Sequence, residues 1–148
     1  MTAAPITTAL LALYNRGGPY SAAQLASVYS DDIHFRDPAH TLTGLAALCD
    51  YLNHQYSNVH ACTFVATGEW ASGDYMFLQW DMHLQHPKLN GGNPITVTGL
   101  SQLQCRSTAD GSPRITQHRD YFDLGQLLYE HVPLLGALNR RLKQGMAS

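Results

Sequence analysis

The spacing of apolar residues changes near the middle of the chain, from a helical period to a period of two. Before residue 59, apolar side chains recur three or four positions apart, as they do on one face of an α-helix. After residue 59, apolar and polar side chains alternate over long segments, as they do on the two faces of a β-strand. Helices followed by a run of strands predict an α+β fold, in which the helices cover one face of a sheet.

Caps and helix breakers indicate where the first two helices begin and end. A first helix over residues 6–14 is expected to stop at Gly17-Gly18-Pro19, since glycine and proline both terminate helices. Ser21 and Gln24 form a capping-box pattern, in which each side chain bonds to the backbone of the other. This pattern predicts a second helix, and helical spacing extends its apolar face to Tyr29.

A third helix and a helical tail complete the predicted helices. An extended segment over Ile33–Asp37 is expected to end at Pro38, and a third amphipathic helix then begins near residues 43–44. At the other end of the chain, Leu124–Lys143 has helical spacing, with Pro133 as a kink or break. We therefore expect three N-terminal helices and a C-terminal helical tail.

Four strands are expected in the second half, separated by turn sequences rich in Gly, Pro, Asn and Asp. The strands are Val59–Trp70, Tyr75–His86, Ile95–Arg106 and Arg114–Asp123. Several of them carry partly apolar residues on both faces, and only 14% of all residues are charged. Together these observations favour a homodimer formed through the sheet.

Composition excludes several classes of protein. With 45% hydrophobic residues among 148, the chain is expected to fold as a single domain over residues 1–148 rather than to stay disordered. A net charge of −2 leaves no broad basic face for a nucleic acid. No apolar stretch approaches the roughly 18 residues that a membrane span needs, so we expect no membrane partner.

The cysteines indicate a reducing environment. Cys49, Cys62 and Cys105 are odd in number, form no CxxC pair and lie in apolar surroundings, so we expect free thiols rather than disulfides. The first 13 residues lack a positively charged start and are interrupted by Pro5, so we expect no signal peptide. Both observations favour a cytoplasmic location.

Two segments carry a resemblance to a known family. They are YSDDIHFRDP at residues 29–38, followed by Gly44 at the start of a helix, and HRDYFDLG at residues 118–125. With the order of elements, they resemble the nuclear-transport-factor-2-like superfamily, and within it the SnoaL-like proteins and the ketosteroid isomerase branch. The resemblance extends from Tyr14 to about Leu142 and implies a cone-shaped fold. In that fold a strongly curved, mostly antiparallel sheet surrounds a pocket that N-terminal helices close.

Three site positions are implied by the resemblance to the isomerase branch. Asp37 matches the general base of that branch, and a carboxylate in an apolar pocket is disfavoured in its charged form, which suits proton transfer. Tyr14 falls on the first helix, where the branch has a tyrosine hydrogen-bond donor. Ser101 stands where the branch has its second donor, a protonated aspartate. This sequence therefore departs from the isomerase set, because a serine hydroxyl donates more weakly.

His118 and Asp120 form a second candidate pair. They lie two positions apart on one predicted strand, so they share a face at a separation of about 7 Å. A shared water or a third group would couple them into a proton shuttle near neutral pH. Asp120 also resembles the deep carboxylate of limonene-epoxide-hydrolase-like and SnoaL cyclase-like relatives, although the Arg-x-Asp pair of the epoxide hydrolases has no counterpart here.

Each candidate also has a purely structural interpretation. An aspartate before proline can end a strand and start a turn, which would account for Asp37. A polar network would account for His118 and Asp120, and ordinary core packing would account for Tyr14. Four further residues are expected to line the pocket as an apolar wall or to belong to the core: Phe35, Trp80, Met82 and Phe122.

No metal or cofactor site is expected. His83 and His86 are three positions apart on a predicted strand, so their side chains point to opposite faces. No cysteine or carboxylate completes a tetrahedral set with them or with His34 and His40. The sequence also has no glycine-rich phosphate loop and no nucleophile elbow.

Two functions of different classes remain open from the sequence. One is a cofactor-independent acid–base enzyme of the isomerase, dehydratase, cyclase or epoxide hydrolase class. It would act on a small, mostly apolar carbonyl-, epoxide- or polyketide-like molecule. The other is a non-catalytic module that binds a small ligand or forms a dimeric interaction surface.

Overall fold

Three helices precede the long strands. The structure is a computed structural model that describes residues 3–57, 59–127 and 140–146. The helices α1 (Ala3–Arg16), α2 (Ala22–Ala26) and α3 (Leu45–Gln55) lie in the first half. The strands are β1 (Tyr29–Arg36), β2 (Thr41–Thr43), β3 (Ala61–Ser72), β4 (Tyr75–Gln85), β5 (Ile95–Ser107) and β6 (Pro113–Phe122), with a short helix η1 (Asn90–Gly92) between β4 and β5. The predicted α+β class is confirmed.

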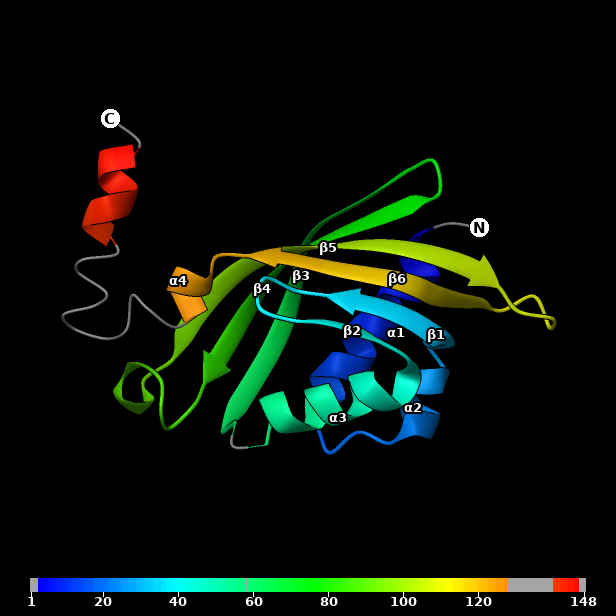
Figure 1. Cartoon of the computed structure of the whole chain (residues 1–148), viewed down its shortest axis with the longest axis horizontal. Helices are drawn as coiled ribbons and strands as arrows, with labels where there is room; N and C mark the ends of the chain where they lie inside the picture. The colour runs from blue at the N-terminus through cyan, green and yellow to red at the C-terminus, as the bar shows by residue number, and fades with distance from the viewer. Residues whose placement is uncertain (1–2, 58, 128–139, 147–148) are drawn as a thin grey trace.

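The six strands form one sheet in the order β2-β1-β6-β5-β4-β3 (Figure 1). Neighbouring strands are antiparallel except β1 and β6, which are far apart in the sequence and pair in parallel. The last rung of that parallel ladder joins Arg36 to Arg119.

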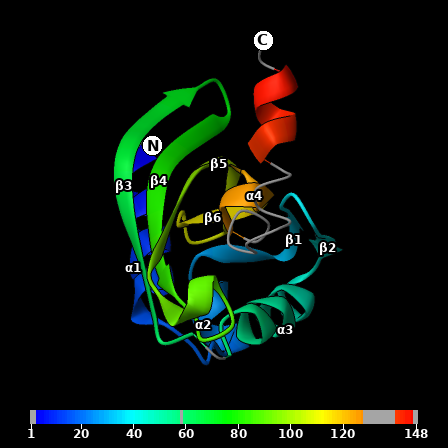
Figure 2. The same cartoon turned by 90° about the vertical axis from the view of Figure 1, so that its left-hand side faces the viewer.

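The sheet is strongly curved, as predicted. Viewed end-on, β3 and β4 form one wall and β1 and β6 another, with α2 and α3 below them (Figure 2). α1 packs against β3, and α3 packs against β1 and β2. The helices therefore cover the concave face of the sheet, and the convex face carries no helix in Figure 1.

Local sequence signals explain the ends of the helices. Ser21 and Gln24 make both bonds of the predicted capping box at the start of α2. Gly44 precedes α3 with φ of 98°, a conformation that glycine adopts without a steric penalty. The assignment of Tyr29 to a helical face was wrong. α2 has only five residues, and Tyr29 begins β1, where it pairs with Ile115 of β6.

Two further differences between the predicted and the observed elements concern short segments. The strand β2 was not predicted, because three residues are too few to show an alternating pattern. The predicted strand Arg114–Asp123 ends one residue earlier, at Phe122, and the helix α4 (Leu124–Leu127) follows. Most of the predicted helical tail, including Pro133, lies outside the described residues, while residues 140–146 are helical.

The core lies between the concave face and the helices. Along β4, every second side chain points inward and is buried: Met76, Leu78, Trp80, Met82 and Leu84. These pack with inward residues of β5 and β6 and with the apolar stripe of α1. In the part of the chain that is described, no helix is long and apolar enough to cross a membrane.

Candidate functional site

A cavity of about 280 Å³ lies on the concave face of the sheet, bounded by α1 and α3. All nine residues singled out from the sequence line it: Asp37, Asp120, His118, Tyr14, Ser101, Phe35, Trp80, Met82 and Phe122. They come from α1, from β1, β4, β5 and β6, and from the turn after β1. The curvature of the sheet brings them together, because inward side chains of a concave sheet converge.

His118 and Asp120 are in direct contact. Nε2 of His118 lies 2.7 Å from Oδ1 of Asp120, so no bridging group is needed and the expected separation of about 7 Å holds only for their backbones. The His118 side chain is 2% exposed and that of Asp120 is 16% exposed. The histidine is therefore enclosed, while the carboxylate remains accessible.

Ser101 adds a second donor to the same carboxylate oxygen. Its hydroxyl donates to Oδ1 of Asp120 at 2.5 Å, across the β5–β6 ladder in which the two residues are direct partners. The indole N–H of Trp80 in turn donates to the Ser101 oxygen at 3.0 Å. Because Trp80 already donates to Ser101, the serine proton is directed toward Asp120.

Two tyrosines extend the network on the other side of the imidazole. The Tyr29 hydroxyl lies 2.8 Å from Nδ1 of His118, and the Tyr14 hydroxyl lies 2.8 Å from that of Tyr29. A carboxylate only accepts hydrogen bonds, so an ionised Asp120 requires His118 to donate through Nε2. A neutral His118 then accepts from Tyr29 at Nδ1, and Tyr29 accepts from Tyr14. In this arrangement the protons of Tyr14 and Ser101 are both used within the network.

Burial keeps the tyrosines protonated. The pKa values of Tyr14 and Tyr29 are raised well above their ordinary value, first by removal from water and further by the charge of Asp120, while the hydrogen bond with Tyr14 partly lowers the pKa of Tyr29. Both phenols therefore act as neutral hydrogen-bonding groups over the whole physiological pH range. The network can rearrange its protons without forming a buried phenolate.

Asp37 directly follows β1, the strand that pairs with β6, and has both a turn role and a cavity role. Its Oδ1 accepts the backbone N–H groups of Ala39 and His40 at 2.9 and 2.7 Å, as expected for an aspartate that starts a turn. Its Oδ2 accepts the hydroxyl of Tyr51, a residue of α3. Each oxygen of Asp37 therefore already has a donor, in contrast to Asp120, whose two donors share one oxygen.

Tyr56 is a cavity residue that sequence reasoning missed. It follows α3 directly and lines the cavity, and among the described residues its hydroxyl has no hydrogen-bond partner. Burial raises the pKa of Tyr56 well above its ordinary value, with smaller contributions from Cys62, Tyr14 and Asp120. A neutral phenol with an unused O–H can donate to a ligand oxygen. Its position four residues after Leu52, where it continues the apolar stripe of α3, was the only signal in the sequence.

The rest of the wall is apolar and aromatic. Phe35 contacts the His118 ring with centroids 4.9 Å apart, which shields the imidazole from solvent. Trp80 contacts Phe64 and Phe122, with centroids 5.4 and 6.3 Å away. Such a wall favours a mostly apolar ligand and strengthens electrostatic interactions inside the cavity.

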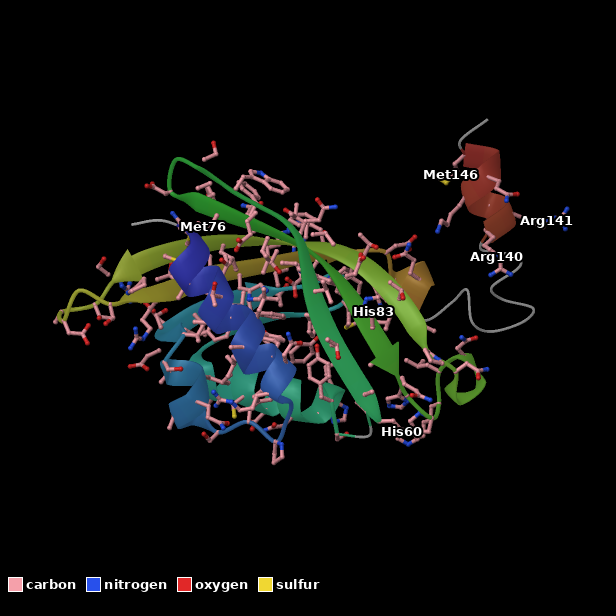
Figure 3. All side chains as sticks on the ribbon, turned by 180° about the vertical axis from the view of Figure 1, so that it is seen from behind. His60, Met76, His83, Arg140, Arg141 and Met146 are labelled. Carbon is pink, nitrogen blue, oxygen red and sulfur yellow. The ribbon has the colours of Figure 1, made fainter. Side chains whose placement is uncertain are left out.

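The histidines outside the cavity do not gather into a metal site. His60 and His83 lie apart along the β3–β4 hairpin (Figure 3), and Nδ1 of His83 is 3.1 Å from the Thr96 hydroxyl. Nδ1 of His34 is 3.2 Å from the Thr43 hydroxyl. No group of three or more metal-ligating side chains occurs within the described ranges. The three cysteines are free and half-buried.

Solved structures with the same fold support the architecture. A protein from Catenulispora acidiphila DSM 44928 with a ketosteroid isomerase-like fold, in complex with trimethylamine, matches with a TM-score of 0.69 at 20% identity, over 86% of this chain and 92% of that one. A protein from Shewanella denitrificans OS-217, assigned as a SnoaL-like polyketide cyclase, matches with a TM-score of 0.66 at 16% identity, over 82% and 90%. AclR from Streptomyces galilaeus, assigned as a hydroxylase, matches with a TM-score of 0.66 at 16% identity, over 96% and 90%. At these identities the likeness shows the fold alone.

The sequence itself identifies the family. A comparison with curated proteins finds no match. The profile of the SnoaL-like domain matches residues 7–118, which is more than half of the 148 residues and includes β1, β4 and β5, whereas Asp120 and Phe122 of β6 lie beyond the match. The cone-shaped fold that the resemblance implied is confirmed, and the chain belongs to the family of SnoaL-like domains.

Proposed function

We propose that this protein is a cofactor-independent acid–base enzyme acting on a small, mostly apolar carbonyl compound. The observation that carries the proposal is the arrangement around Asp120. Two donors, His118 and Ser101, hold one of its oxygens at 2.7 and 2.5 Å, and the side chain stays accessible from the cavity. A carboxylate held in one orientation inside an apolar cavity is suited to proton transfer.

In the proposed reaction, Asp120 removes a proton from the carbon next to the carbonyl group of the substrate. The electron pair of that C–H bond moves toward the carbonyl oxygen, so an enolate forms and Asp120 becomes a carboxylic acid. Return of the proton to another atom of the substrate completes an isomerisation, and loss of a leaving group completes an elimination. His118 stays within hydrogen-bond reach of Asp120 throughout and can supply or hold a proton.

Tyr56 is proposed as the donor to the enolate oxygen. Its O–H has no partner among the described residues, whereas the protons of Tyr14 and Ser101 are used within the network. Its raised pKa keeps this proton in place, and Tyr56 and Asp120 line the same cavity. A donor aimed at a developing oxyanion in a cavity that excludes water is an effective source of rate acceleration.

Asp37 is proposed as the second carboxylate of the site. It lines the cavity, as Asp120 does, and is held by Tyr51 and the turn after β1. In this position it can return a proton to a bound substrate. Since three donors already hold it, we assign the first proton abstraction to Asp120.

Hydrogen–deuterium exchange tests this proposal without knowledge of the natural substrate. The probe is 2-tetralone, a small apolar ketone with acidic protons next to its carbonyl, incubated with the protein in D2O and followed by NMR. We expect the protein to accelerate exchange over buffer, and Asp120→Asn to lower that acceleration by about 100-fold. Tyr56→Phe should lower it by about tenfold or more.

A matched control comes from the convex face. Asp81 of β4 points away from the cavity and accepts from the Thr98 hydroxyl at 2.8 Å, so Asp81→Asn should leave exchange unchanged. Equal exchange rates for the wild-type protein and Asp120→Asn would contradict the proposal. In that case, an unchanged bound molecule seen by native mass spectrometry would favour the non-catalytic binding module.

We also propose that the protein works as a cytoplasmic homodimer formed through the convex face. Trp70 and Tyr75 are 46% and 37% exposed there, and Phe77 stacks on Trp70 with centroids 5.8 Å apart. These aromatic side chains form a continuous apolar strip on β3 and β4. A second copy would remove it from water. The three free cysteines are consistent with a reducing compartment.

A further inference from the structure

A second cavity opens where β1 leaves the sheet. The parallel ladder of β1 and β6 stops at the rung of Arg36 and Arg119, whereas β6 continues to Phe122. The chain after Arg36 turns away at Pro38, and a groove of about 470 Å³ lies between this turn and residues 119–122 of β6. Its walls include Asp37, Asp120 and Phe122, which also line the main cavity. The groove therefore adjoins the main cavity at its two carboxylates.

Two arginines define the charge of this groove. Arg36 and Arg119 are direct neighbours across the ladder, where like charges repel each other. In the described ranges, neither guanidinium group has a carboxylate partner. By contrast, Arg106 pairs with Asp32 at 3.2 Å, and Arg114 donates to a backbone carbonyl at 2.8 Å. Two adjacent cations without an acidic partner form a site that an anion would stabilise.

Arg119 is held in place by an aromatic ring. Its guanidinium carbon lies 4.6 Å from the centre of the Tyr121 ring, another wall of the groove. This cation–π contact restricts the arginine side chain while its N–H groups remain free to bind. The entropic cost of ordering that side chain on binding a ligand is therefore reduced.

The two aspartates of the groove do not neutralise the arginines through direct pairing. Asp37 accepts from the backbone of Ala39 and His40 and from Tyr51. Asp120 accepts from Ser101 and His118. Their presence nevertheless favours a ligand with a single negative charge over a phosphate dianion, because a dianion would be repelled more strongly.

We propose that this groove binds the carboxylate of an acidic substrate whose apolar body occupies the main cavity. The inference rests on the proposed function and narrows its substrate class to carbonyl compounds that carry a carboxylate. Guanidinium groups match the geometry of a carboxylate and form charge-assisted hydrogen bonds with it. Bound in this way, the substrate would present its middle part to Asp120, at the junction of groove and cavity.

Calorimetric titration with two matched probes tests the inference. The probes are 2-naphthylacetate and its uncharged amide, 2-naphthylacetamide, which share the same apolar body. We expect the wild-type protein to bind the acid more tightly than the amide by about tenfold or more, as for a charged hydrogen bond. Arg36→Gln and Arg119→Gln should each reduce this preference, and the double variant should abolish it.

The amide also reports whether the variants remain folded, because its affinity should not change in any of them. Arg106→Gln is the matched control. It also removes one positive charge, but from the outer face of β5, the strand next to β6. Its preference for the acid should equal that of the wild-type protein.

Two other results would overturn the inference, and they can be told apart. Equal binding of acid and amide by the wild-type protein, or a preference that survives in the double variant, would refute the arginine site and leave the proposed function intact. Failure of both probes to bind would contradict the apolar ligand cavity itself, and this inference with it.

Discussion

The hydroxyl oxygen of Tyr29 lies 2.8 Å from Nδ1 of His118, and the two rings stack with centroids 5.8 Å apart. Nε2 of the same ring faces Asp120 at 2.7 Å. Tyr29 therefore determines which nitrogen of the imidazole carries the proton that Asp120 accepts. It is a positioning residue, because it acts on Asp120 through His118.

Tyr29→Phe should loosen this control of the His118 tautomer. The variant leaves a buried Nδ1 without its donor, so we expect a loss of roughly 1–3 kcal/mol in the free energy of unfolding. The ¹⁵N chemical shifts of His118 should change from one tautomer to a mixture, and ketone exchange should fall. Tyr14→Phe is the control, because Tyr14 bonds to Tyr29 and not to His118. An unaltered tautomer in Tyr29→Phe would refute the positioning role.

Gly99 is expected to be required for the orientation of Trp80. A Cβ atom at Gly99 would lie 2.2 Å from the Trp80 indole, so Gly99→Ala must displace the ring that donates to Ser101. We expect a destabilisation of about 1–3 kcal/mol, as for overpacked cores, together with a shift in tryptophan fluorescence. Gly68→Ala is the comparison, since its closest contact is 3.2 Å, to the exposed Trp70. Equal urea midpoints for the two variants would contradict this expectation.

Because several tyrosines are buried, we expect the protein to lose stability at high pH. Burial raises the pKa of Tyr20 from 10.0 to about 12, and those of Tyr14, Tyr29 and Tyr56 lie well above the ordinary value. The unfolded chain ionises these phenols above about pH 10, whereas the folded protein keeps them protonated. Their contribution to stability is therefore complete below pH 10 and is lost as the pH rises further.

Urea unfolding at pH 8, 10 and 11 measures this effect. The free energy of unfolding should fall between pH 10 and pH 11, and the fall should be smaller in Tyr20→Phe, which has one raised phenol fewer. A free energy of unfolding that does not change between pH 10 and pH 11 would show that the phenols are not protected from ionisation in the folded state.

The aromatic strip on β3 and β4 predicts the response of the dimer to substitution. Replacement of Trp70 and Phe77 by serine should shift the protein toward a monomer in sedimentation velocity at micromolar concentration. Tyr121→Ser is the control, because Tyr121 is similarly exposed, at 41%, but lies on β6, two strands away from β4. A wild-type protein that sediments as a monomer of 16.3 kDa would rule out the dimer.

Alternation in the sequence was sufficient to place His118, Asp120 and Ser101 on one face of the sheet. Their convergence within hydrogen-bond distance depends on the β5–β6 register, in which Ser101 faces Asp120. The sequence alone does not specify that register. For the same reason the Arg36–Arg119 rung could not be foreseen, because it joins two segments more than 80 positions apart in parallel.

Local sequence patterns gave a wrong prediction, or none, where the chain changes direction. Tyr29 follows Leu25 at helical spacing, yet pairing with β6 takes it into β1 and toward His118. Tertiary pairing overrides helical propensity at the end of a five-residue helix. For Tyr51 and Tyr56 the sequence showed only helical spacing. Their position on the cavity wall results from the packing of α3 against β1 and β2.

The sequence by itself determined the class of the fold, the family and the set of polar side chains that face inward, because periodicity and caps are local properties of the chain. Only the tertiary structure decided which of these side chains share a proton. Hydrogen bonds require donor–acceptor distances of about 2.7–3.2 Å, and such contacts arise only when the neighbouring strands β1, β6 and β5 pair in this register.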